Sequence, residues 1–389
     1  MFYIIYYIYM NIYICIIVLI CLKEIQSKIV KAELNLFIQN LDILIYLSDK
    51  EVVYLSVDSE SQSMWISELL LNKRPEDAML LSKFNTTIKG YEATVEEYED
   101  KIEVINYRKN DTTKLKMNYL IVSDNIRESI AFEAVGAFAF KVEDKKYSIT
   151  HMLYESGEIQ ERSFSLNCLN RTRNEMYFGG VPQEKRMKYQ AELKVRELNE
   201  KWNVNMEYVI YSNKANVFYR NNFISYFTTN KRHVKCPQFF YDLMKENYLH
   251  KAFTDDLCET NKYDDTITCR YAVVNILGNI TFVFDNIKIE KNVRELFQFH
   301  NNMYEFIFHR NRESNEWAIG IDFFITYITT FDYDAKSIIL HSDSKFDLFY
   351  SNTNSNTKTN FGISLIIKID SMLLLLFTIL NIFIVKSIK

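Results

Sequence analysis

The chain has 389 residues, of which 8 are glycine and 3 are proline, and its 46 basic and 50 acidic residues give a net charge of −4. Average proteins contain about 7% Gly and about 5% Pro, so collagen-like and proline-rich architectures are excluded. The chain has no glycine-rich phosphate loop, no HExxH motif and no basic stripe, which argues against nucleotide, zincin-type metal and nucleic-acid sites. We expect neither a cofactor nor a metal ion.

The N-terminal segment, residues 1–22, is uncharged and strongly apolar. About 20 apolar residues are enough to span a bilayer. The segment lacks the basic start and the small-residue cleavage site of a typical signal peptide, so signal peptide and signal anchor both stay open. Either one directs the chain into the secretory pathway.

The segment between the two ends has the patterning of β-strands. Short alternations of apolar and polar residues, separated by polar turns, indicate half-buried strands. Examples are Glu51–Asp58, Lys101–Tyr107, Trp202–Tyr211 and Asn279–Phe284. Helical stretches are few, and the clearest is Gln238–Leu249, which follows Pro237. The sequence therefore predicts an all-β protein with a few short helices.

Two sets of residues agree with secretion. Four sequons make their asparagines glycosylation candidates: Asn85, Asn110, Asn170 and Asn279. Cys258 and Cys269 are spaced to close a short disulfide loop in an oxidising compartment. No pair of cysteines has the close spacing of a structural zinc site.

The C-terminal end consists of a polar linker, residues 346–362, and an apolar tail, residues 363–389. A polar spacer before an apolar tail is typical of a lipid-anchor signal. Lys386 and Lys389 at the very end favour a transmembrane tail with its charges outside the bilayer. We predict membrane attachment, with the ectodomain lumenal or extracellular.

The stretch Trp317–Asp332, WAIGIDFFITYITTFD, resembles the C-terminal signature of pepsin-like aspartic proteases. Further segments resemble motifs of that family in the family's order. They are Val57–Ile66, Ile105–Tyr107, Val135–Phe140, Phe164–Leu166 and Tyr177–Val181. The resemblance covers about residues 33–345.

The resemblance implies an all-β, bilobal fold, with an N-terminal lobe at 33–188 and a C-terminal lobe at 189–345. In this family each lobe donates one catalytic Asp, and a peptide or protein ligand lies between the lobes under a flap. The flap tyrosine corresponds to Tyr107. We expect a monomer whose partners are such a ligand and the membrane, without nucleic acid.

The resemblance assigns the first catalytic loop to Asp58-Ser59-Glu60, where the family has Asp-Thr-Gly. For the second loop, the best register within Ala215–Phe227 puts Phe218 at the position of the second Asp. No acidic residue lies between Glu207 and Asp242, so a shifted register restores no carboxylate. The chemistry needs two carboxyl groups that share a proton. The sequence thus predicts a single catalytic residue, Asp58.

Three functions stay open. The first is a membrane-attached pseudoprotease of the secretory pathway, with impaired hydrolysis. The second is an active, divergent aspartic endopeptidase, which would need a partner carboxylate such as Glu60 or Asp322 within hydrogen-bond reach of Asp58. The third is a non-proteolytic adhesion or receptor ectodomain that resembles the family only by chance.

Overall fold

The structure is a computed structural model, and all the residues it describes belong to the first of two compact units, Met1–Phe349 and Tyr350–Lys389. The described residues are 29–36, 41–48, 50–61, 63–88, 91–106, 111–123, 136–139, 148–169, 174–196, 201–212, 216–220, 224–261, 264–300, 302–312 and 314–349. No helix within these ranges has the length and hydropathy of a membrane-spanning segment. The predicted terminal segments 1–22 and 363–389 lie outside them.

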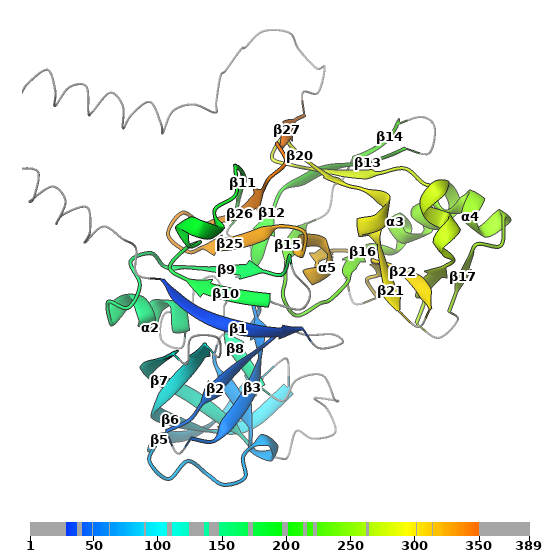
Figure 1. The fold of residues 1–389 in the computed structure, drawn as a ribbon. Helices are drawn as coiled ribbons and strands as arrows, with labels where there is room; N and C mark the ends of the chain where they lie inside the picture. The colour runs from blue at the N-terminus through cyan, green and yellow to red at the C-terminus, as the bar shows by residue number, and fades with distance from the viewer. Residues whose placement is uncertain are drawn as a thin grey trace, which may run out of the picture. The chain divides into compact units, whose positions relative to one another are not determined.

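The largest sheet of the described residues has thirteen strands (Figure 1). In spatial order its strands are β11 (Tyr189–Lys194), β26 (Ser337–Ser342), β25 (Ile328–Asp332), β9 (Ser163–Asn167), β10 (Asn174–Phe178), β1 (Val30–Leu36), β2 (Leu41–Tyr46), β3 (Val52–Asp58), β8 (Gly136–Ala139), β4 (Trp65–Ser67), β7 (Asp111–Val122), β6 (Tyr91–Asn106) and β5 (Met79–Ile88). Strands from both ends of the described chain therefore share one sheet.

Three smaller sheets come from the second half of the chain (Figure 1). The second sheet contains β12 (Trp202–Val204), β15 (Ser225–Phe227), β24 (Trp317–Ile319), β16 (Val234–Cys236) and β23 (Phe308–Arg310). The third contains β14 (Asn216–Arg220), β13 (Met206–Ser212), β19 (Ile280–Phe284), β20 (Ile287–Lys291) and β27 (Asp347–Leu348). The fourth contains β17 (Cys258–Thr260), β18 (Ile267–Cys269), β22 (Met303–Phe306) and β21 (Phe297–His300).

The described helices are short. The α-helices are α2 (Ile149–Glu155), α3 (Gln238–Leu243), α4 (His250–Thr254) and α5 (Ile321–Phe324). A π-helical turn, η4 (Met244–Tyr248), and four 3-10 turns, η1 (Glu68–Leu70), η3 (Gln183–Lys185), η5 (Tyr271–Asn275) and η6 (Val293–Leu296), complete the set. The prediction of an all-β fold with a few short helices is confirmed.

Aromatic side chains join the sheets into one core. Phe164 on β9 stacks on Phe331 of β25 with ring centroids 4.6 Å apart, and Trp202 of the second sheet meets Phe331 edge-on at 5.1 Å. In the second half of the chain, Phe323 of α5 meets Phe282 of β19 edge-on at 5.0 Å. Buried aromatic pairs of this kind contribute about 0.5–1.5 kcal/mol each beyond the burial of their surface. These contacts hold α5 and the strands around it in fixed positions.

Candidate active site

The first loop follows β3 and is organised around Asp58, whose side chain is buried. Its Oδ1 atom accepts hydrogen bonds from the backbone N–H groups of Glu60, at 2.8 Å, and Ser61, at 2.9 Å. An aspartate that accepts from backbone donors two and three residues ahead stabilises a tight turn. The carboxylate is therefore held in one orientation at the end of a buried strand.

A second loop meets the first through two hydroxyl groups. The Thr229 hydroxyl donates to the Val57 carbonyl oxygen at 2.5 Å and accepts from the Ser59 N–H at 2.9 Å. In return, the Ser59 hydroxyl oxygen accepts from the Thr229 N–H at 3.0 Å. All of these groups are buried, and a hydroxyl is able to donate and accept at once. Ser59 and Thr229 thus have equivalent roles in an interlock between the two loops.

The strand pairing around the two loops repeats. β3 runs parallel to β8 with Val57 opposite Phe138, and β15 runs parallel to β24 with Phe227 opposite Ile319. On its other side, β8 pairs antiparallel with β4, and β24 pairs antiparallel with β16 in the same way. The two halves of the site therefore share one architecture.

The equivalent of Asp58 follows from this repeat. β4 pairs with β8 at Trp65, seven residues after Asp58, and β16 pairs with β24 at Lys235, seven residues after Thr228. Thr228 also accepts a hydrogen bond at its hydroxyl oxygen from the Asn230 N–H at 3.1 Å, as Asp58 does from Glu60. The second loop is Thr228-Thr229-Asn230, and a threonine stands at the place of the second Asp.

The prediction that Phe218 occupies this place is wrong. Phe218 lies on β14 and pairs with Ile210 of β13, ten residues before Thr228 in the chain. Tyr219 and Arg220 follow it on the same strand. The adjacent aromatic residues Phe218 and Tyr219 belong to a hairpin strand that precedes β15. The loop is identified by the seven-residue spacing from Thr228 to Lys235 on β16, which matches the spacing from Asp58 to Trp65. This spacing identifies the loop even though it contains neither an Asp nor a Gly.

Glu60 brings a second carboxyl group to the site. The Thr228 hydroxyl donates to Glu60 Oε1 at 2.5 Å. Burial raises the pKa of the Glu60 carboxyl and the charge of Asp58 raises it further, while the Thr228 hydrogen bond, Lys201 and Lys231 act in the opposite direction. The carboxyl group that contacts Thr228 therefore comes from the first loop itself.

Gly320 allows α5 to approach the second loop. A Cβ atom at Gly320 would lie 2.2 Å from the His233 carbonyl oxygen and 2.5 Å from that of Lys231. The N–H groups of Ile321 and Asp322 donate to the carbonyl oxygens of Lys231 and Arg232, at 2.9 and 2.8 Å. The start of α5 is thus docked on the backbone that follows Thr228-Thr229-Asn230.

The remaining predicted site residues have different outcomes. The disulfide between Cys258 and Cys269 is confirmed, with an S–S distance of 1.99 Å across β17 and β18. Asn85 and Asn279 are exposed. Tyr107, Asn110 and Asn170 lie outside the described residues.

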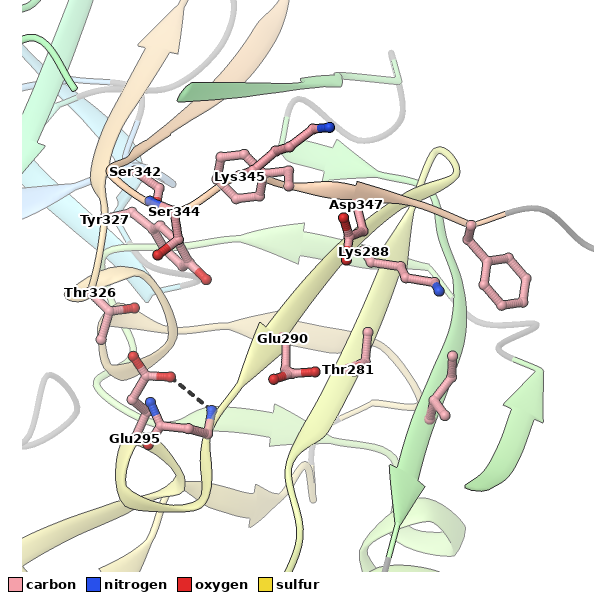
Figure 2. A pocket seen from close by; sticks show the side chains of 14 residues that line it. Thr281, Lys288, Glu290, Glu295, Thr326, Tyr327, Ser342, Ser344, Lys345 and Asp347 are labelled. Carbon is pink, nitrogen blue, oxygen red and sulfur yellow. Dashed lines mark hydrogen bonds between the residues drawn. The ribbon is translucent and has the colours of Figure 1, made fainter. Parts of the chain in front are cut away.

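A cavity of about 640 Å³ lies elsewhere, beside β19 and β20 (Figure 2). Its lining is polar and carries both signs of charge, including Lys288, Glu290, Glu295 and Lys345. None of the residues of the two interlocked loops lines it. The cavity is therefore separate from the Asp58 site.

Comparison with known proteins agrees with this geometry. The crystal structure of an aspartic proteinase from Irpex lacteus is similar to this chain with a TM-score of 0.63 and 12% sequence identity, over 81% of this chain and 97% of that protein. No functionally curated protein matches the sequence. The family model described as eukaryotic aspartyl protease matches residues 129–342, more than half of the chain. The chain belongs to the eukaryotic aspartyl protease family.

Proposed function

We propose that this protein binds an extended peptide between its lobes but is impaired in peptide-bond hydrolysis. The observation that carries the proposal is Thr228 at the place equivalent to Asp58. In the two-carboxylate mechanism one group is ionised and activates water while the other is protonated and donates to the substrate. A threonine hydroxyl does not ionise under these conditions and cannot take either role.

A second candidate is hydrolysis by Asp58 together with Glu60. It is favoured by the Thr228–Glu60 hydrogen bond and by the raised pKa of Glu60. Two carboxyl groups whose environments separate their pKa values are the usual arrangement of an acid and a base. In this scheme Asp58 activates the water and Glu60 is the proton donor. Asp322 does not serve as the partner in this scheme, because its carboxylate contacts His233.

We prefer the pseudoprotease to the second candidate because Glu60 stands where the family has glycine. The glycine in that loop leaves the space beside the carboxylate open, whereas the Glu60 side chain reaches across to Thr228. The family membership also removes the premise of the third alternative, a resemblance by chance.

Cleavage of a quenched peptide library between pH 3 and pH 6 tests the proposal on the full-length protein. We expect no cleavage by the wild type. The Glu60→Gly/Thr228→Asp double variant restores both family residues and should cleave, with a loss of at least about 10²-fold when Asp58→Asn is added. Wild-type cleavage that disappears in both Asp58→Asn and Glu60→Gln would instead establish the second candidate.

We also propose that the protein is a membrane-attached monomer of the secretory pathway. The disulfide supports an oxidising compartment, and the exposed Asn85 and Asn279 are accessible to glycosylation. The apolar segments 1–22 and 363–389 would supply entry and attachment. We expect the protein to stay in the membrane pellet after alkaline carbonate extraction. We also expect its electrophoretic mobility to shift on N-glycosidase treatment.

A further inference from the structure

Two histidines and a glutamate converge in the C-terminal half of the chain, outside the Asp58 site. His233 precedes β16, Glu305 lies on β22 and His309 lies on β23. Glu305 Oε1 is 3.4 Å from His233 Nε2 and 3.1 Å from His309 Nε2. One ligand atom from each residue lies within 4.8 Å of the other two.

We propose that His233, Glu305 and His309 bind a divalent transition-metal ion, with Zn²⁺ as the best chemical match. Two atoms bound to one zinc ion at about 2.0–2.1 Å in tetrahedral directions lie about 3.4 Å apart, which is close to both histidine–glutamate separations. Imidazole nitrogens with one carboxylate are a preferred donor set for zinc, and three protein ligands leave one position for water.

The residues behind the cluster support a metal site. His233 Nδ1 is 2.8 Å from Asp322 Oδ2, and because a carboxylate only accepts, the imidazole donates from Nδ1. In the neutral imidazole this tautomer carries its lone pair on Nε2, on the side of Glu305. Asp322 is held in turn by the side-chain amide of Gln298, which also accepts from Arg232. A carboxylate that orients a metal-binding histidine in this way is a regular feature of zinc sites.

A metal ion is able to reach the cluster from solvent, but the imidazole rings do not yet have the orientation that binds it. The side chains of His233 and Glu305 are each 17% exposed, so an ion is able to reach them from solvent. The two imidazole rings are stacked, with centroids 3.9 Å apart and planes 11° apart. Because a metal ion lies in the plane of each imidazole that binds it, the His309 ring must rotate about χ2 when the ion enters, while His233 keeps its contact with Asp322. Two cationic side chains lie nearby: Arg232, whose Nε is 3.6 Å from Asp322 Oδ1, and Lys235, which acts electrostatically on His309.

Metal binding would act on the second loop through its neighbours. His233 lies five residues after Thr228, and Asp322, which orients His233, donates its N–H to the Arg232 carbonyl oxygen at 2.8 Å. The ion would therefore brace the chain between Thr228 and β16. This inference does not depend on whether the protein hydrolyses peptides.

The test is titration of the chelator-treated, full-length protein with Zn²⁺ by calorimetry and with Co²⁺ by visible absorption. We expect about one ion per chain and the intense visible bands of tetrahedral Co²⁺. His233→Gln, Glu305→Gln and His309→Gln should each weaken binding at least about tenfold. His250→Gln, at an exposed histidine on α4, is the matched control and should bind as the wild type does.

Absence of binding by the wild type, or equal binding by His233→Gln and wild type, would overturn the proposal in favour of a metal-free network of ion pairs. Thermal unfolding of each metal-free variant shows whether it is folded. If the more buried His309→Gln variant is unfolded, the wild-type Co²⁺ spectrum and the His233→Gln titration decide the question.

Discussion

Four hydroxyl and carboxyl side chains around Asp58 determine what the candidate site is able to do. Ser59 and Thr229 hold the two loops together, whereas Glu60 and Thr228 meet at the place of the missing second Asp. The interlock resembles that of the family, because each of the two loops contributes one hydroxyl group, from Ser59 and from Thr229. The reacting groups have changed, because one loop position has lost a carboxylate and another has gained one.

Replacement of Thr229 tests the interlock at the scale of a single residue. Thr229→Val keeps the shape of the side chain but leaves the Val57 carbonyl and the Ser59 N–H without their hydroxyl partner. A buried polar group that loses its partner costs about 1–3 kcal/mol, so the free energy of unfolding should fall by about that amount in urea titration. Thr254→Val, at an exposed threonine on α4, is the control and should change it by less than about 0.5 kcal/mol. Equal effects of the two substitutions would contradict the role of the interlock.

Part of the site could be predicted from the sequence. The other part could not, because its residues come together only in the folded chain. Asp58, Ser59 and Glu60 are neighbours in the chain, so one motif identifies them. Glu60 and Thr228 are 168 residues apart, and only the folded loops bring them together. In the proposed metal site, Glu305 and His309 are four residues apart, but His233 is distant from both in the chain and no short motif connects it with them.

At the scale of elements, period-two alternation identified strands well but not their partners. The predicted strands Glu51–Asp58 and Asn279–Phe284 correspond to β3 and β19. The prediction for Trp202–Tyr211 is divided between β12 and β13, which belong to different sheets. Alternation reports that one face of a strand is buried and not which strand lies beside it, so the pattern of β14 alone does not distinguish it from the strand of the second loop.

The Cys258–Cys269 disulfide belongs to this scale because it joins two paired strands, β17 and β18. A cross-link over 11 residues restricts the unfolded chain by about 3 kcal/mol in the chain-entropy treatment. The Cys258→Ser/Cys269→Ser double variant should therefore have a free energy of unfolding lower by about 3 kcal/mol. It should unfold at a lower denaturant concentration than the wild type. Addition of a reductant should shift the wild type in the same direction and leave the double variant unchanged. A reductant-insensitive wild type would show that the bond does not contribute.

At the scale of the molecule, three strands near the β11 edge of the thirteen-stranded sheet are linked by a buried polar chain. Ser165 on β9, Thr330 on β25 and His341 on β26 are joined by hydrogen bonds of 2.8 and 2.9 Å. Burial lowers the pKa of His341 to about 4. The side chain is thus neutral in the folded protein over most of the acidic range, where a free histidine is charged.

This histidine predicts how the stability of the whole molecule depends on pH. The pKa of His341 is about 4 when folded and about 6.5 when unfolded, so between these values the unfolded state binds the extra proton. Its contribution to stability is complete above about pH 6.5 and is lost as the pH falls towards 4, by about 3 kcal/mol in total. His341→Gln should flatten the dependence of the thermal midpoint on pH in this window, and His250→Gln should not. An unchanged slope in His341→Gln would contradict the assignment.

The order of strands in the largest sheet has a consequence for how the protein is made. β25 and β26 are among the last described strands to leave the ribosome, yet they lie between β9 and β11, which are synthesised more than a hundred residues earlier. Until they arrive, one edge of β9 has no neighbour, and open strand edges invite pairing with other chains. A nascent chain that stops before Ile328 would therefore expose this unpaired edge, and the arrival of β25 and β26 covers it.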